Sequence, residues 1–296
     1  MNAPHFGRVV VVGVGLIGAS FALAGKRAGL FERVIGVGRS RANLEQAQAM
    51  GAIDAAAGDA GAACADADLV FLATPVGQLG ALMRAIAPRL GARTIVTDAG
   101  STKADVVALA REHLGAHLAR FVPAHPIAGG DRSGAAAADP ELYRARRVVL
   151  TPLEATDPAA LAAVRATWEA LGAQVSLLSP ERHDRVYAAV SHLPHLLMFA
   201  LVDAFARRDD GSDLFAHAGR GLSDTTRIAG GSPEMWRDIS LANRAALLAE
   251  LDAYTAALAR ARAMLAQGDG AALEALYANA RRARLAWMGG AAGVEG

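Results

Sequence analysis

Several features are scarce in this 296-residue sequence, and their scarcity narrows the class of protein. A single cysteine, Cys64, cannot form an internal disulfide and suits a reducing compartment such as the cytoplasm. Neither charge is in excess, since 30 Lys and Arg residues stand against 29 Asp and Glu residues. This balance argues against a protein that binds nucleic acid or a membrane surface, because such proteins carry a basic excess on one face.

Long uninterrupted apolar runs are also lacking. Val9–Gly25 is uncharged, but it contains four glycines and Arg8 is the only basic side chain just before it. Leu196–Ala206 is far shorter than the roughly 20 residues that a membrane-spanning helix needs, and Asp203 interrupts it. We therefore expect neither an export signal nor a membrane span.

The sequence does contain a regular alternation of strand-like and helix-like segments up to about residue 180. The strand-like segments are Val9–Val12, Val34–Val37, Leu69–Ala73, Thr94–Asp98, Phe121–Ala124, Val148–Thr151 and Val175–Leu178. Segments of helical composition lie between them, at Ala19–Ala28, Arg41–Met50, Gln78–Ala87, Thr102–Leu114 and Pro158–Leu171. Continuous apolar strands that alternate with helices predict an α/β fold of the Rossmann type, with a doubly wound, largely parallel sheet.

Beyond Pro180 the strand-like segments disappear. An Ala-, Leu- and Arg-rich stretch with helical periodicity runs from His183 to Met288. We therefore predict two domains, an NAD(P)-binding Rossmann domain over residues 1–180 and an all-α domain over residues 181–296.

A nucleotide-binding signature follows the first predicted strand directly. The run Gly13-Val14-Gly15-Leu16-Ile17-Gly18 opens a helix, so strand, motif and helix are in register. The first glycine permits a tight turn, the second lets the backbone approach a pyrophosphate, and the third lets the helix pack close to the strand. The positive end of the helix, which starts at Leu16 and Ile17, then faces the phosphates.

The end of the second strand bears on the choice between the two nicotinamide cofactors. NAD-specific sites place Asp or Glu there, but this chain has Gly38, followed by Arg39 and Ser40. Without the carboxylate a 2′-phosphate is not repelled, and Arg39 can pair with it, so NADP is favoured over NAD. The alternative is that Arg39 is merely a solvated loop residue.

The Thr74-Pro75 pair ends another strand and either borders the nicotinamide ribose or is just a turn.

Five later segments narrow the chemistry. They are Thr97–Lys103 (TDAGSTK), His125–Gly134 (HPIAGGDRSG), Ser191–His195 (SHLPH), Asp224–Ala229 (DTTRIA) and Met235–Ile239 (MWRDI). In this order, and together with the glycine motif, they make the chain resemble the prephenate/arogenate dehydrogenases of tyrosine biosynthesis from Val9 to about Arg284. The resemblance implies oxidative decarboxylation of prephenate to 4-hydroxyphenylpyruvate, or of arogenate to tyrosine, with hydride transfer to NADP or NAD. It also implies a homodimer formed through the helical domain.

The resemblance assigns the catalytic histidine to His125, which accepts the proton of the substrate hydroxyl, and places Ser101 beside it. From the residues alone, the alternatives are that His125 caps a turn before Pro126 and that Ser101 caps the helix expected to begin at Thr102, a role that is compatible with substrate binding.

Residues in the helical half are assigned to substrate binding by the same resemblance. Arg227 would hold a substrate carboxylate with two parallel hydrogen bonds, although an arginine in this Arg-rich region is ordinarily a surface residue. His192 and His195 share a helical face; His195 reaches the substrate, and His192 is structural. No third ligand supports zinc at this pair, so no metal is expected. Trp236 is either core or pocket wall, and we favour the core.

The chain departs from the family pattern at Gly130-Asp131, where glutamate is common. Asp131, a shorter acid, is therefore a candidate substrate contact. Two other functions stay open. Other two-domain reductases, such as 3-hydroxyacid dehydrogenases, usually rely on a lysine in the helical half, and no lysine follows Lys103. A non-catalytic NADP-binding protein would have no chemical need for His125, Ser101 and Arg227 together.

Overall fold

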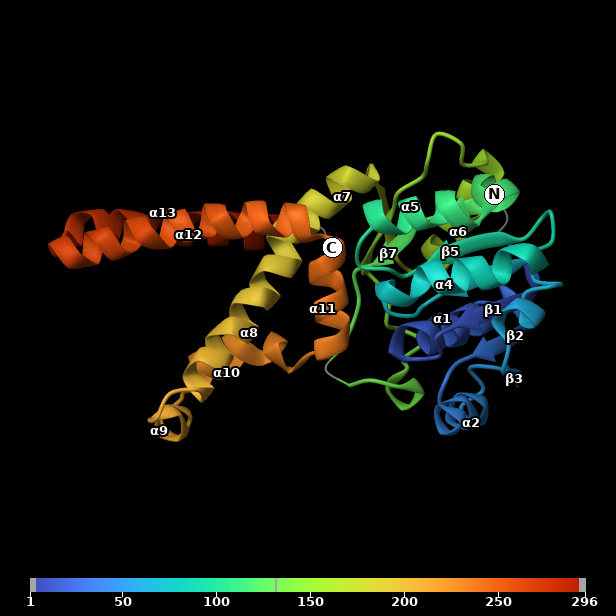
Figure 1. Cartoon of the computed structure of the whole chain (residues 1–296), viewed down its shortest axis with the longest axis horizontal. Coiled ribbons are helices and arrows are strands. Elements are labelled where there is room, and N and C mark those ends of the chain that lie inside the picture. Colours follow the sequence, from blue (N-terminus) through green and yellow to red (C-terminus); the bar gives the residue numbers. More distant parts are fainter. Residues whose placement is uncertain (1–3, 131, 293–296) are drawn as a thin grey trace. The chain divides into compact units, whose positions relative to one another are not determined.

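The computed structural model describes residues 4–130 and 132–292, and it confirms a Rossmann-type α/β fold followed by helices (Figure 1). The chain divides into two compact units, one ending at Arg244 and one beginning at Ala245. All the strands found in the described residues belong to the first unit. The last strand ends at Leu177, and the division into domains at residue 180 stays a prediction.

The larger sheet of the first unit has six parallel strands in the order β3-β2-β1-β4-β5-β6. They are β1 (Phe6–Val12), β2 (Phe31–Val37), β3 (Ala55–Ala57), β4 (Leu69–Leu72), β5 (Ile95–Asp98) and β6 (Phe121–Val122). Val9 of β1 lies between Val34 of β2 and Leu69 of β4. Because the strand order reverses between β1 and β4, the carboxyl ends of these strands border the crevice in which this fold binds ligands.

Not all of the predicted strands belong to this larger sheet. The strands β7 (Ala124–Pro126), β8 (Arg147–Leu150) and β9 (Gln174–Leu177) form a second sheet, in which β7 is antiparallel to β8 and β8 is parallel to β9. The predicted strand Phe121–Ala124 divides between the two sheets at Pro123, which has no N–H to donate to a ladder. β3 was not predicted, because its three alanines carry none of the β-branched residues that mark strands.

Helices cover both faces of the larger sheet. They are α1 (Leu16–Arg27), α2 (Arg41–Ala49), α3 (Ala60–Ala63), α4 (Val76–Ile86), α5 (Ala104–His113) and α6 (Pro158–Ala170), with short 3-10 turns η1 (Ala87–Arg89), η2 (Gly115–Arg120) and η3 (Ala135–Ala137). Val9 and Val11 belong to one buried cluster, and Val10 and Val12 belong to another. Since alternate residues of a strand point to opposite faces, β1 is buried on both sides, which explains why its sequence is continuously apolar.

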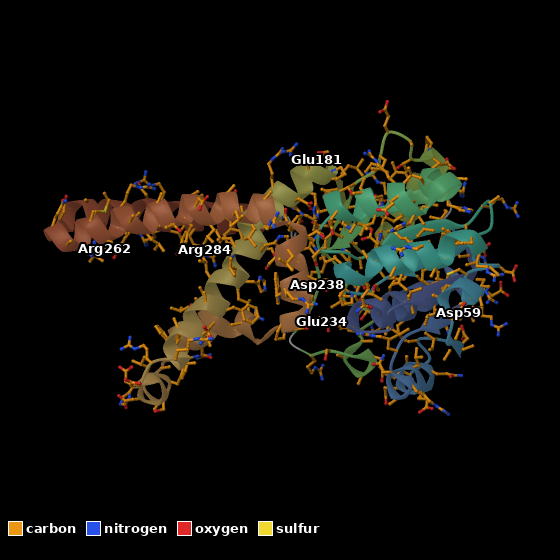
Figure 2. The ribbon with its side chains drawn as sticks, viewed as in Figure 1. Asp59, Glu181, Glu234, Asp238, Arg262 and Arg284 are labelled. Atoms are coloured by element: carbon orange, nitrogen blue, oxygen red, sulfur yellow. The ribbon has the colours of Figure 1, made fainter. Side chains whose placement is uncertain are left out.

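The helices that follow also pack into the first unit. They are α7 (Pro180–Tyr187), the π-helical turn η4 (Ala188–His192), α8 (Leu193–Ala206), α9 (Gly211–Ala216), α10 (Arg220–Thr226), the 3-10 turn η5 (Arg227–Gly230) and α11 (Pro233–Ala242). α7 contacts α5, and α11 contacts α4. Asp238 of α11, labelled in Figure 2, fits against Gly77 in the first turn of α4, where a Cβ atom would lie 2.6 Å from its Oδ2. A carboxylate at this position is favoured by the positive end of α4.

The run Pro180–Ala206 is long and apolar enough to cross a membrane by length and composition, and 17% of its most apolar window is buried. The expectation from the sequence counted only Leu196–Ala206, which begins after the residues Ser191–His195. In the structure the helix continues through them by way of the π-turn. An exposed apolar helix of this kind is typical of a surface that a partner covers.

The second unit consists of most of α12 (Arg244–Gln267) and of α13 (Gly270–Ala292). Gly268, with a φ of 63°, ends α12 in the left-handed conformation that glycine adopts at little cost. The Asp269 carboxylate accepts a hydrogen bond from the Ala272 N–H at 2.9 Å and so caps the start of α13.

Candidate active site

The glycine motif forms a cradle between β1 and α1. Gly13 has a φ of 98°, and a Cβ atom there would lie 2.6 Å from the Ala73 carbonyl oxygen. A Cβ atom at Gly18 would overlap the Gly13 carbonyl oxygen and lie 2.9 Å from Val11 Cγ1. A Cβ atom at Gly15, the N-cap residue of α1, would have no other protein atom within 4 Å. Two glycines are therefore needed for packing, and the third leaves open space at the positive end of a helix.

Two polar side chains border this cradle. Thr74 Oγ1 is buried and has no hydrogen-bond partner among the described residues. Asn43 connects the motif to a distant loop: its Nδ2 donates to the Val14 carbonyl at 2.5 Å, and its Oδ1 accepts from the Ala135 N–H at 2.7 Å. An unsatisfied hydroxyl and an open helix terminus fit the ribose and pyrophosphate of a dinucleotide.

The residues that bear on the cofactor's ribose lie at the carboxyl end of β2. Gly38, Arg39 and Ser40 are exposed, and the Ser40 hydroxyl caps α2 by accepting from the Asn43 N–H at 3.2 Å. Arg41 is engaged with Glu45 through a 2.8 Å hydrogen bond, whereas the Arg39 side chain forms no hydrogen bond or ion pair with any described residue. Arg39 is thus the available cation at this position.

His125 lies on β7 with 9% of its surface exposed. Burial lowers the pKa of its imidazole well below 6.5, and the nearby His183, Lys103 and His192 lower it further. The ring packs edge-on against Tyr187 of α7, with 4.9 Å between ring centroids. His125 is therefore neutral near pH 7 and is able to accept a proton.

A buried ion pair supports the strand that carries His125. Asp98, at the end of β5, accepts a hydrogen bond from the Lys103 ammonium, and both side chains are fully buried. Lys103 Nζ also donates to the Ala124 carbonyl at 2.8 Å, and Asp98 Oδ1 accepts from the Ala124 N–H at 3.0 Å. The ion pair thus binds both the N–H and the carbonyl of Ala124, the residue before His125. It thereby connects β5 of the larger sheet to β7 of the smaller sheet.

Helix α7 places a second histidine directly behind His125. His183 Nε2 lies 2.8 Å from His125 Nδ1, and His183 Nδ1 lies 2.8 Å from Asp184 Oδ1. The Asp184 carboxylate also accepts from the N–H groups of Lys103 and Ala104, at 2.8 and 2.9 Å. Burial alone would raise the pKa of Asp184, but the hydrogen bonds from His183 and from these N–H groups lower it on balance.

The helical half contributes a stacked aromatic pair. His195 stacks on Trp236 of α11, with 3.6 Å between centroids and 22° between planes, and His195 Nδ1 donates to the Ser191 carbonyl at 2.8 Å. Burial lowers the pKa of His195, and so does the positive charge of Arg227, which lies close by. Trp236 is partly buried: it packs against a core cluster, as expected, and it also lines a pocket beside α8.

His192 is close both to the His125–His183 pair and to His195. It is 1% exposed, and burial lowers its pKa to about 4. Its Nδ1 lies 3.1 Å from Asn243 Nδ2, and Asn243 also donates to the Asp184 carbonyl at 2.8 Å. Since His183 and His195 both act on its pKa, His192 lies close to both of them. These contacts gather residues from β7, α7, η4, α8 and α11 into one site.

Ser101 lies beside His192, and a hydrogen bond with its backbone partly offsets the lowering of the His192 pKa. It does not cap the following helix. α5 begins at Ala104, and its first N–H groups are capped by Asp184 from α7, so the helix start is set by a tertiary contact. Asp131 lies outside the described residues.

Several important residues were not found from the sequence. Lys103, Asp98, His183, Asp184 and Asn43 are all polar and buried or half-buried, and each has at least one hydrogen-bond partner more than 20 residues away in sequence. The first two belong to the TDAGSTK run, which was recognised only for its serine. For His183-Asp184 the available signal was a His-Asp pair at the start of the helical half, but a surface helix would carry the same pair.

A dinucleotide cradle and a buried, neutral histidine within the same compact unit are typical of a nicotinamide-dependent oxidoreductase. Two family models match the chain: the nucleotide-binding domain of prephenate dehydrogenase over residues 21–177, and its dimerization domain over residues 179–279. The chain belongs to the prephenate dehydrogenase family.

Individual relatives agree with this assignment. The chain is 34% identical to cyclohexadienyl dehydrogenase of Zymomonas mobilis, over 95% of this chain and 96% of that protein. Prephenate dehydrogenase from Aquifex aeolicus, solved with hydroxyphenyl propionate and NAD+, is 33% identical with a TM-score of 0.90, over 96% of this chain and 99% of that one. Synechocystis arogenate dehydrogenase is 33% identical with a TM-score of 0.77, over 94% and 98%.

Proposed function

We propose that this protein catalyses the oxidative decarboxylation of prephenate, of arogenate, or of both, with a nicotinamide cofactor as hydride acceptor. Membership of the prephenate dehydrogenase family supports this function, and so do relatives that act on each substrate. The observation that carries the proposal is the buried, neutral His125 on β7, and we propose that Arg227 and His195 bind the substrate beside it.

The chemistry balances with His125 as the proton carrier. His125 accepts the hydroxyl proton of the substrate while hydride leaves the same carbon, which becomes a carbonyl carbon. The bond to the ring carboxylate then breaks, its electrons enter the ring, and carbon dioxide leaves. The ring becomes aromatic, and the new phenol oxygen takes the proton back from His125. The bound nicotinamide supplies the hydride acceptor, and the residues that would hold the cofactor are Gly13, Gly15, Gly18, Thr74 and Pro75.

Arg227, His195 and Ser101 are the residues for substrate binding. The Arg227 guanidinium can hold a carboxylate with two parallel hydrogen bonds, and its charge reaches His195. Nδ1 of His195 already donates to the Ser191 carbonyl, so only Nε2 is available to a substrate. The Ser101 hydroxyl forms no hydrogen bond with a described residue and is available to bind the substrate hydroxyl. Asp131 remains a further candidate.

NADP is the proposed preferred cofactor, with NAD as the alternative. Gly38 removes the carboxylate that would hold a ribose 2′-hydroxyl, and the exposed Arg39 is available for a 2′-phosphate. The A. aeolicus relative was solved with NAD+, which supports NAD as the alternative. The variant Arg39→Ala should raise the KM for NADP about tenfold, because a charged hydrogen bond contributes about 1.5–3 kcal/mol, and should leave the KM for NAD unchanged.

The protein is proposed to form a homodimer in the cytoplasm. Its match to a dimerization domain supports the dimer, and the second unit exposes many large apolar side chains. These are Leu248, Leu258, Leu265, Leu276, Tyr277, Leu285, Trp287 and Met288. An apolar surface of this extent is unusual for a monomer. Light scattering after size exclusion should give twice the chain mass of 30.4 kDa, and a stable monomer would contradict the dimer.

The decisive test is the initial rate of reduced-cofactor formation from prephenate and from arogenate, each with NADP and with NAD. Turnover of either substrate supports the reaction, and the rate ratios give both preferences. The variant His125→Asn is the matched control, since it should bind cofactor normally and lose activity by at least about a hundredfold. A folded wild-type protein that is inactive in all four mixtures would refute the proposed function.

A further inference from the structure

Three side chains form a continuous line that ends at the proposed base, His125. Asp184 and His183 come from α7, and His125 comes from β7. The two hydrogen bonds that connect them are both 2.8 Å long, and His183 is fully buried. Among the described residues, His183 is the only hydrogen-bond partner of the His125 ring.

The direction of each proton in this line follows from the carboxylate. Asp184 accepts from the N–H groups of Lys103 and Ala104, so it is an ionised acceptor. The His183 nitrogen that faces it, Nδ1, must therefore carry the proton. A neutral imidazole has one N–H and one lone pair, so Nε2 of His183 is an acceptor. Nδ1 of His125 must then donate to it, and the lone pair of His125 is left on Nε2.

We propose that His183 and Asp184 are positioning residues that fix His125 in the tautomer protonated on Nδ1, with Nε2 free to accept the substrate hydroxyl proton. This inference rests on the proposed function, in which His125 is the base. When Nε2 takes the proton, the imidazolium keeps its hydrogen bond to His183, and the nearby Asp184 carboxylate stabilises the positive charge.

The packing around the line keeps this arrangement in place. The Tyr187 ring contacts both imidazoles, with centroids 4.9 Å from His125 and 4.5 Å from His183. The other titratable groups that face His125 are Lys103, before α5, and His192, from η4. Lys103 is committed to Asp98 and to the Ala124 carbonyl, and it has no lone pair to offer. His183 is thus the acceptor available to Nδ1 of His125.

The first test measures the tautomer directly on the wild-type holoenzyme. With ¹⁵N-labelled histidine, long-range proton–nitrogen spectra at pH 7.5 should show His125 with a protonated Nδ1 and an unprotonated Nε2. The spectrum of a His125→Asn variant identifies the signals. The opposite tautomer, or an even mixture, would overturn the proposal. This measurement needs no substrate, so it is independent of whether the proposed reaction occurs.

The second test compares two substitutions at His183. Gln offers a carbonyl oxygen to His125 and an N–H to Asp184, so it preserves the polarity of the line, whereas Phe fills the space without an acceptor. His183→Phe should lower kcat about a hundredfold or more, because second-layer partners of an imidazole contribute about 10–100-fold and a wrong tautomer costs up to about 10⁴-fold. His183→Gln should remain within about tenfold of the wild type.

A purely structural role for His183 predicts a different result. Then both substitutions would impair folding and cofactor binding to a similar degree, and KM would change along with kcat. We expect circular dichroism and the Kd for the reduced cofactor to stay close to wild type in His183→Gln. Equal losses in the two variants, or full activity in His183→Phe, would overturn the proposal. If His183→Phe does not fold, the wild-type spectrum still decides it.

Discussion

The substitution of Gly15 by alanine tests the nucleotide cradle without disturbing the fold. A Cβ atom at Gly15 has no protein atom within 4 Å, and the residue has a φ of −93°, which alanine adopts without strain. Alanine is a poorer helix cap than glycine by several tenths of a kcal/mol, but it restricts the unfolded chain by about 0.4–1 kcal/mol. The two effects oppose each other, so the free energy of unfolding should change by less than about 1 kcal/mol.

Cofactor binding should respond strongly to the same change. If the open space above Gly15 receives the pyrophosphate, the added methyl occupies the place of the phosphate oxygens. We expect the Kd for the reduced cofactor to rise at least about tenfold, which corresponds to about 1.4 kcal/mol. Fluorescence titration of the reduced cofactor gives the Kd, and urea unfolding of the same samples gives the stability.

Gly18→Ala is the matched control for this experiment. Its methyl would overlap the Gly13 carbonyl oxygen and approach Val11 Cγ1 to 2.9 Å, and a backbone oxygen cannot move aside as a side chain can. We expect a loss of about 1–3 kcal/mol in unfolding free energy, as found for overpacked cores, together with weaker cofactor binding. Normal cofactor affinity in a stable Gly15→Ala protein would show that the pyrophosphate lies elsewhere and refute this account of the cradle.

Three further predictions concern buried groups. Because burial lowers the pKa of His192 to about 4, its contribution to stability is complete above pH 6.5 and is lost as the pH falls toward 4, by about 3 kcal/mol. Urea midpoints between pH 8 and pH 4 should follow this course, and a flat profile would contradict it. Asp98→Asn leaves the Lys103 charge buried without its partner and should cost about 3–5 kcal/mol of unfolding free energy, whereas an unchanged urea midpoint would mean that the pair is dispensable. Burial raises the pKa of the Cys64 thiol to about 12, so a thiol reagent at pH 8 should modify Cys64 only after unfolding; rapid reaction of the native protein would contradict its burial.

The fold class was predictable because its signals are local. Continuous apolar strands, helical segments between them and a glycine motif in register each follow from neighbouring residues, and the structure agrees on all but β3 and the division into two sheets. Those two differences have local causes as well, three alanines in β3 and Pro123 between β6 and β7. Their effect on strand pairing, however, depends on which strands lie alongside, and the sequence does not specify that.

The candidate site was only partly predictable. The sequence by itself determined the nucleotide cradle, because each glycine acts on its own backbone, and its motifs singled out His125, Ser101, His195 and Arg227. Only the tertiary structure brought His183 behind His125, placed Asp184 over the start of α5 and stacked His195 on Trp236. These contacts join residues 41 to 80 positions apart. A buried polar group needs a hydrogen-bond partner, and the fold decides which distant residue supplies it. The spacing of residues along the chain therefore could not identify that partner.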